Sequence, residues 1–199
     1  MAMKKPANWD NVKAVAEREA LPVGAYVCKI IAAENRTYPT RDGGSFDRLE
    51  VAFDIIEGDF AGHYQKDFDA QRGEDRKWKG VLRLYVPTDD GSEQDAWTQS
   101  VFKGFTEALE ASNLGYHWDW EEKGLKGKLL GILFRNEQWA MGERSGWKTQ
   151  PFRALAVDTV RAGKFTIPKD KPNKNAVSID VQPGAGDFAV VADDEDLPF

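Results

Sequence analysis

Aromatic and cationic side chains are interleaved in two stretches of this 199-residue chain, residues 64–85 and 135–153, with a smaller group at 36–41. Lysine and arginine neutralise phosphates, and exposed rings stack on unpaired bases, so this combination suits a single-stranded nucleic acid. The candidate contact residues are Arg36, Tyr38, Arg41, Tyr64, Lys66, Arg72, Arg76, Lys77, Trp78, Lys79, Arg83, Tyr85, Trp139, Arg144, Trp147, Lys148 and Arg153.

Two tryptophans in these stretches have neighbours that favour exposure. Trp78 lies between two lysines in a polar segment, and Trp147 lies beside a glycine in a turn. We therefore expect Trp78→Ala or Trp147→Ala to weaken binding of poly-dT, because one base–aromatic contact contributes about 1–3 kcal/mol. Tyr85 and Trp139 fit the core and the surface equally well.

Carboxylates lie among these cations and admit a second chemistry. Asp67, Asp69, Glu74 and Asp75 are most simply solvated partners of the neighbouring Arg and Lys, but gathered in one site they would suit a Mg²⁺-dependent nuclease. No lysine-bearing nuclease motif accompanies them. The two histidines and single cysteine lack zinc-ligand spacing, and no glycine-rich phosphate loop or nucleophile motif occurs. We expect a binding protein without a catalytic residue, metal or cofactor.

The charge of the chain is concentrated at its C-terminal end. The formal net charge is −6, of which residues 187–199 contribute −5, and this leaves −1 on residues 1–186. A nearly neutral body is compatible with one cationic groove, because the net charge says little about a local surface. No apolar stretch indicates a signal peptide or a membrane span, so we expect a cytoplasmic protein with no membrane partner.

The last seven residues combine four acids with a short apolar tip. The acids favour an extended, solvated tail, Pro198 restricts φ before the last residue, and Phe199 offers a ring together with a carboxylate. A partner needs an apolar pocket, a cation for the carboxylate and a basic rim. The candidate partner-binding residues are Asp193, Asp194, Glu195, Asp196, Leu197, Pro198 and Phe199. An ordinary acidic tail is the alternative interpretation.

This tip resembles the C-terminal tip of bacterial and phage single-stranded DNA-binding proteins. The resemblance implies that Asp193–Phe199 binds replication, recombination and repair proteins. Residues 21–30 and 49–62 also resemble the first strand, second strand and following turn of phage members of that family. The N-terminal strand pattern and Gly/Gln-rich linker of the cellular bacterial members are absent, so their tetramer is not implied, and a homodimer is compatible with the sequence.

Periodicity predicts the elements that must position the candidate residues. Leu49, Val51, Phe53 and Ile55 alternate with more polar residues, as in a half-buried strand. The expected strands are 25–36, 49–56, 63–68, 81–86, 125–139 and 149–160, with a loop at 140–148 and helices at 11–20 and 92–112. In the longer helix Trp97, Phe102 and Phe105 are expected in the core. In the first strand Cys28 is expected to be buried and inert.

Strands precede and follow one long helix without β–α–β alternation. This order predicts a mainly β fold, an OB-fold-like five-stranded barrel with an inserted capping helix and an extra hairpin, with a β-sandwich as the alternative. We expect the DNA-binding domain at 1–167, including an N-terminal extension at 1–20, and a flexible acidic tail at 168–199. The expected function is non-specific binding and protection of single-stranded DNA in phage replication and recombination. A protein-binding adaptor that touches no DNA is the alternative.

Overall fold

The computed structural model describes residues 4–11, 20–142 and 144–173 of the chain. Five antiparallel strands form one sheet in the order β3-β2-β1-β4-β5, which confirms the mainly β prediction, and within these residues the strands do not divide into two sheets. The elements are η1 (Trp9–Asn11), β1 (Ala25–Pro39), β2 (Ser45–Ile55), α1 (His63–Asp69), β3 (Val81–Tyr85), α2 (Glu93–Ser112), η2 (Glu122–Leu125), β4 (Leu129–Met141), β5 (Arg144–Leu155) and α3 (Val157–Arg161).

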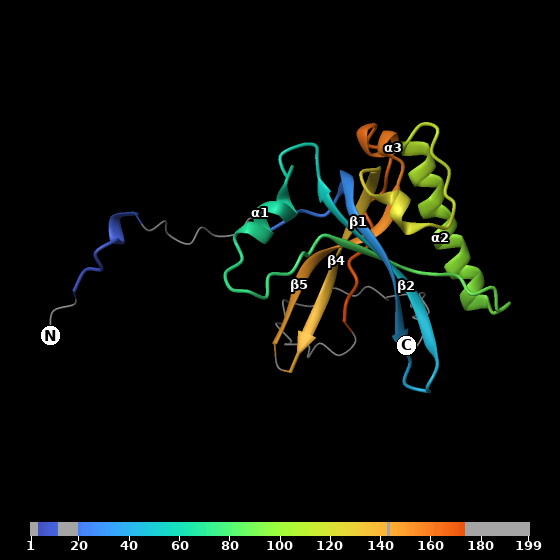
Figure 1. Cartoon of the computed structure of the whole chain (residues 1–199), viewed down its shortest axis with the longest axis horizontal. Helices are drawn as coiled ribbons and strands as arrows, with labels where there is room; N and C mark the ends of the chain where they lie inside the picture. Colours follow the sequence, from blue (N-terminus) through green and yellow to red (C-terminus); the bar gives the residue numbers. More distant parts are fainter. Residues whose placement is uncertain (1–3, 12–19, 143, 174–199) are drawn as a thin grey trace, which may run out of the picture.

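The sheet is strongly curled around its central strand. β1 pairs with β2 along most of its length and with β4 only over Ala25–Lys29, and the register with β2 shifts between Ile30 and Ala32. The edge strands β3 and β5 contact each other although they lie at opposite ends of the strand order. The free parts of the β1–β2 and β4–β5 hairpins extend from the same end of the sheet as two diverging arms (Figure 1).

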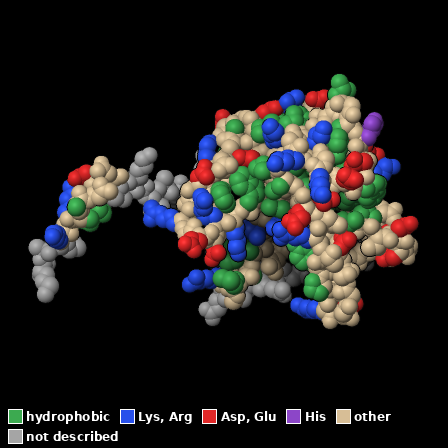
Figure 2. Space-filling model, viewed as in Figure 1, with side chains coloured by type: hydrophobic (Ala, Val, Ile, Leu, Met, Phe, Trp, Pro, Cys, Tyr) green, Lys and Arg blue, Asp and Glu red, His purple; other side chains and the backbone are tan. Residues whose placement is uncertain are grey.

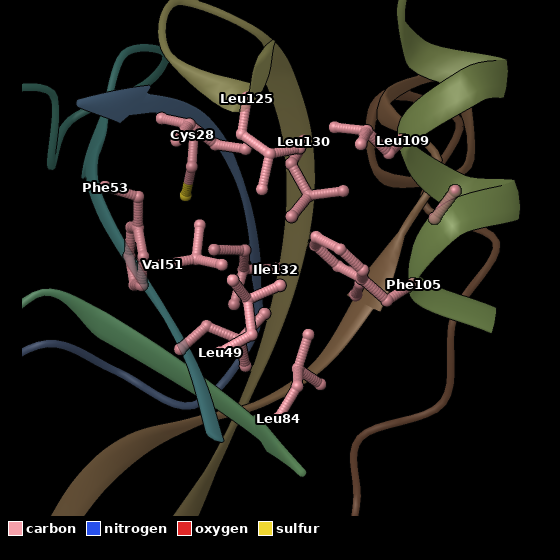
Figure 3. Close-up of a cluster of buried hydrophobic side chains, with 14 of the residues drawn as sticks. Cys28, Leu49, Val51, Phe53, Leu84, Phe105, Leu109, Leu125, Leu130 and Ile132 are labelled. Carbon is pink, nitrogen blue, oxygen red and sulfur yellow. The ribbon is translucent and has the colours of Figure 1, made fainter. Parts of the chain in front are cut away.

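The core fills the inside of this curl. The alternating residues of β2, from Leu49 to Ile55, are buried as the period-2 pattern predicts. Phe105 and Leu109 reach from α2 toward Leu130 and Ile132 of β4, so α2 covers one side of the sheet (Figure 3). Cys28 is buried among these side chains, as expected, and burial raises the pKa of its thiol, with a further contribution from the Asp54 carboxylate.

One end of α2 is fixed by two acceptor side chains. The Ser92 hydroxyl accepts a hydrogen bond from the Asp95 N–H (3.0 Å), which satisfies a free donor of the first turn. The Asp95 carboxylate accepts hydrogen bonds from the backbone N–H groups of Thr88 (2.8 Å) and Asp89 (2.9 Å) and from the Gln99 amide (2.7 Å). Asp95 therefore joins the segment after β3 to the start of the helix.

These hydrogen bonds give Asp95 a pH-dependent role. Its pKa lies below the ordinary value, first because of the Thr88 N–H and then because of the Gln99 amide, although burial opposes the shift. The stabilisation is therefore present above the carboxyl pKa of the unfolded chain, about 3.9, and is lost as the pH falls through the lower folded value. We expect Asp95→Asn to lower the urea midpoint at pH 7. Between pH 5 and pH 2 the midpoint of the variant is expected to fall by less than that of the unmodified protein. Parallel curves for both proteins would contradict this role.

The predicted strand at 63–68 is wrong, and the one at 149–160 is wrong in part. Residues 63–68 form α1, because Gly62 turns the chain in a left-handed conformation (φ 71°) and the Asp54 carboxylate accepts the N–H groups of Tyr64 (3.0 Å) and Gln65 (3.3 Å). The last expected strand ends at Leu155. Beyond it, the Ser112 hydroxyl accepts the Val157 N–H (3.0 Å), and α3 begins there.

Other boundaries also differ from the prediction. The expected loop at 140–148 is mostly strand, because β4 and β5 pair as far as Met141 and Arg144, and Gly142 leaves the strand with a φ of 60°. β4 begins at Leu129, and Leu125 is the last residue of η2. The polar segment after Pro168 follows the sheet: Lys171 exchanges backbone hydrogen bonds with β4 (2.9 Å each). Most of the expected helix at 11–20 and the expected tail from residue 174 lie outside the described residues.

The prediction that Trp97 is in the core is wrong. Trp97 is 59% exposed, whereas Phe102 and Phe105 are buried as expected and Leu109 is buried beside them. Residues spaced by four drift by about 40° per step around a helix of 3.6 residues per turn. Trp97 therefore lies about 120° from Leu109 and off the buried face.

Candidate nucleic-acid interface

The outer surface of β1, β2 and β3 gathers arginines and aromatic rings from three segments. Strand register sets Tyr38 opposite Phe46 and Arg36 opposite Arg48, and β3 adds Tyr85 opposite Arg48. These side chains alternate with the core residues and thus lie on the other side of the sheet. We call this surface the hairpin face; it consists of Arg36, Tyr38, Phe46, Arg48, Glu50, Arg83 and Tyr85.

Three rings form a row across the hairpin face. The Tyr38 and Phe46 rings are stacked, with centroids 5.6 Å apart and planes 20° apart, and Phe46 is 5.3 Å from Tyr85. The Arg48 guanidinium lies 4.2 Å from the centre of the Tyr38 ring. Tyr85 is 41% exposed, and Tyr38 and Phe46 are half-buried. The row offers apolar ring surface directly beside guanidinium groups, as base stacking and phosphate neutralisation require.

An acid lies in the middle of this cationic surface. The Glu50 carboxylate accepts hydrogen bonds from the Tyr38 hydroxyl (2.8 Å) and from Arg48 (2.7 Å), and Arg83 lies 3.4 Å away. Burial alone would raise the pKa of Glu50, but the hydrogen bonds from Tyr38 and Arg48 and the nearby guanidinium charges hold it below its ordinary value. Glu50 is therefore ionised at neutral pH and partly neutralises the face.

A second candidate surface is the groove between α1 and β5, with a volume of ≈ 870 Å³. Its lining includes Lys66, Lys79, Trp147 and Lys148, all from the predicted set, together with Asp67, whose carboxylate is 3.0 Å from the Lys79 ammonium. Trp147 is 50% exposed, which confirms the expected accessibility of its ring. We call this surface the α1–β5 groove.

The β4–β5 arm carries Trp139, another of the predicted aromatic residues. Trp139 is 37% exposed and lies against Gly146 on the neighbouring strand, where an added Cβ would be 3.0 Å from the indole ring. Arg153 is 5.2 Å from the ring centre of Phe152, and Arg135 is 4.1 Å from it. The predicted Arg144 begins β5 and is exposed at the tip of the arm.

Two predicted contact residues are unsuited to base stacking. Tyr64 is only 8% exposed and packs edge-on against Phe53, with ring centroids 5.4 Å apart, so it belongs to the core. Trp78 is half-buried, and its Nε1–H donates to the backbone carbonyls of Phe53 and Gly80 (3.1 Å each). The expectation of an exposed Trp78 is wrong, because its indole connects the loop before β3 to the sheet.

Replacement by alanine is therefore expected to have different effects at Trp147 and at Trp78. Trp147→Ala is still expected to weaken oligo-dT binding, by the amount of one base contact, about 1–3 kcal/mol. Trp78→Ala is instead expected to lower stability, because it removes packing and leaves two carbonyl groups without their indole donor. Fluorescence anisotropy and urea unfolding of both variants measure the difference. Weakened binding by a fully stable Trp78→Ala protein would contradict the assignment.

Four predicted cations belong to neither surface as defined here by its residues. Arg41 is exposed in the turn between β1 and β2, and Arg72, Arg76 and Lys77 are exposed in the segment between α1 and β3. Arg76 lies 4.7 Å from the centre of the Phe68 ring. Charges on the molecule are mixed, with acidic and basic side chains adjacent on the face seen in Figure 2. The aromatic row therefore distinguishes the hairpin face better than charge does.

Phe46 and Arg48 belong to the hairpin face, although they are not among the predicted contact residues. Both alternate with the core residues of β2, and Phe46 lies directly across the turn from Tyr38. The alternation of side chains along β2 could have indicated them, because it places Phe46, Arg48 and Glu50 on the side opposite the core residues. On the β4–β5 arm, Arg135 lies over the ring of Phe152 in the same way as Arg48 lies over Tyr38.

The described residues contain no group of three or more His, Cys, Asp or Glu side chains arranged to hold a metal ion. No helix within this part of the chain combines the length and apolar character needed to cross a membrane. Comparison of the sequence with protein-family models and with curated proteins finds no match.

Proposed function

We propose that the protein binds single-stranded DNA without sequence specificity on the hairpin face, with the α1–β5 groove as a second contact area. The observation that carries this proposal is the row of Tyr38, Phe46 and Tyr85 beside Arg36, Arg48 and Arg83. Rings of this kind accept any base, because every base has a π-face, and arginines bind the backbone, which is common to all sequences. Contact with bases in a duplex is blocked, since those bases are stacked on each other.

The topology supports an OB-fold-like barrel within this proposal. A β1-β2-β3 meander is followed by α2 and then by the β4–β5 hairpin, and the edge strands β3 and β5 approach each other. OB-folds commonly bind oligonucleotides on the face of strands 2 and 3 and on the loops β1–β2 and β4–β5. The hairpin face lies on those strands, and the α1–β5 groove adjoins the second hairpin.

The biological role follows from coating exposed strands. A protein that covers unpaired bases melts hairpins and blocks nucleases, which suits phage DNA replication and recombination. The segment Asp193–Phe199 then recruits replication or repair proteins through its acidic residues and apolar tip. Deletion of these seven residues tests the recruitment of partners. Unchanged binding of replication or repair proteins by the shortened protein would contradict it.

Titration with single-stranded and double-stranded oligonucleotides tests the proposed DNA binding. Quenching of tryptophan fluorescence by oligo-dT, with log K falling linearly with log salt concentration, is expected for stacking combined with phosphate neutralisation. A protein that binds neither form of DNA would instead act as an adaptor. Degradation of the labelled oligonucleotide in Mg²⁺ would indicate a nuclease.

A further inference from the structure

Glu50 is enclosed by the cations of the hairpin face. Its side chain is 15% exposed, and its Oε1 atom takes the Tyr38 hydroxyl at 2.8 Å, Arg48 Nη2 at 2.7 Å and Arg83 Nε at 3.4 Å. The other oxygen, Oε2, lies 3.9 Å from Arg36 Nη1. A single carboxylate thus faces three guanidinium groups and a hydroxyl.

The three arginines are held unequally. Arg48 makes a short hydrogen bond and is 23% exposed, whereas Arg36 and Arg83 are half exposed, at 51% and 50%, and lie farther from Glu50. Arg36 also donates two hydrogen bonds to Glu34, at 2.9 and 2.6 Å, and the strand register places Glu34 opposite Glu50. Arg48 and Tyr38 therefore form a fixed base with Glu50, and Arg36 and Arg83 are the guanidinium groups that solvent and an incoming anion can reach.

Donor capacity exceeds acceptor capacity in this cluster. Three guanidinium groups face two carboxylates, Glu34 and Glu50, so the formal charge is +1. Within the described residues, the Nε atom of Arg48 is buried and has no hydrogen-bond partner. An anion at the exposed Arg36 and Arg83 would supply further acceptors. The cluster thus has the composition of an anion site in which one position is taken by a side chain of the protein.

We propose that Glu50 is an internal counterion whose place at Arg36 and Arg83 is taken by a backbone phosphate of the bound strand, while Glu50 keeps Arg48 and Tyr38 in position. This inference rests on the proposed DNA binding. Arginine forks match phosphate oxygens in geometry and form strong charge-assisted hydrogen bonds. The carboxylate limits repulsion among the arginines in the free protein. In the complex it repels the phosphate, so it lowers affinity and speeds release.

The variant Glu50→Gln tests this balance. Glutamine keeps a carbonyl acceptor for Tyr38 and Arg48 but carries no charge. Affinity for oligo-dT is expected to rise by roughly three- to tenfold at low salt, because the two weak ion pairs to Arg36 and Arg83 no longer compete with phosphate. The salt dependence is expected to become steeper, because these arginines then release solution anions when DNA binds.

A matched control removes one negative charge elsewhere. Glu57 pairs with Arg161 of α3 at 2.6 Å, outside the hairpin face, so Glu57→Gln is expected to leave affinity and salt slope unchanged. Equal or weaker DNA binding by Glu50→Gln, in a protein whose unfolding midpoint shows that it is folded, would overturn the proposal. Failure of the unmodified protein to bind oligo-dT would instead contradict the proposed function itself.

A measurement on the unmodified chain covers the case in which Glu50→Gln does not fold. Nuclear magnetic resonance can follow the Nε–H signals of the arginines during titration with oligo-dT and, separately, with thymidine, which lacks phosphate. The Arg36 and Arg83 signals are expected to shift with the oligonucleotide and not with the nucleoside. Unchanged Arg36 and Arg83 signals in a saturated oligonucleotide complex would overturn the inference and leave DNA binding intact.

Discussion

Phe46→Ala is expected to weaken binding of oligo-dT by between about five- and 150-fold, the loss that corresponds to one stacking contact of about 1–3 kcal/mol. Phe46 is the central ring of the row and contacts both Tyr38 and Tyr85. Its removal therefore takes away one stacking surface and loosens the two that remain. Fluorescence anisotropy of a labelled oligonucleotide at fixed salt measures the change.

Trp97→Ala is the matched control for this experiment. Trp97 is a large exposed ring on α2, outside the hairpin face, and its loss is expected to leave affinity unchanged. Unaltered binding by a folded Phe46→Ala protein would remove the ring row as the base-stacking surface. Equal losses in both variants would indicate a general effect of removing surface aromatics.

Phe105→Ala is expected to have the largest effect on stability, about 3–5 kcal/mol in the free energy of unfolding. Phe105 is 1% exposed and lies between α2 and the sheet, in contact with Phe102 (5.9 Å) and Trp118 (6.4 Å). Truncation would leave a cavity at the place where the helix closes the curled sheet. Urea unfolding followed by circular dichroism measures the loss.

Trp97 also serves as the control for stability, because it lies on the same helix but outside the buried face. Trp97→Ala is expected to change the free energy of unfolding by no more than about 0.5 kcal/mol. If Phe105→Ala cost no more than Trp97→Ala, α2 would not be part of the cooperative core. The packing of α2 on the sheet through Phe105 would then be contradicted.

Sequence periodicity predicted the elements whose burial follows a local pattern. The alternation in β2 reports directly which side of the strand is buried, and Phe102, Phe105 and Leu109 report the inner face of α2. The pattern failed at α1, because an i,i+4 pair such as Tyr64 and Phe68 fits a strand as well as a helical turn. There the Asp54 carboxylate, ten residues before Tyr64, decides in favour of the helix.

The candidate site was predictable in composition but not in arrangement. Arg36, Tyr38, Arg83 and Tyr85 come together because two strand registers align, and registers are set by the whole sheet rather than by neighbouring residues. Trp78 is a residue for which the local sequence indicates the wrong environment, because its two lysine neighbours favour exposure. Its indole donates to Phe53, 25 residues away, which no local pattern indicates.

Competition between two DNA forms tests the central idea most directly. The full-length protein is titrated at modest ionic strength with labelled oligo-dT, and unlabelled single strand or duplex of equal length then competes. The single strand is expected to displace the label at a concentration at least roughly tenfold lower than that of the duplex, since only unpaired bases reach the rings of Tyr38, Phe46 and Tyr85. Equal competition by the duplex, or no binding of the labelled strand, would contradict it.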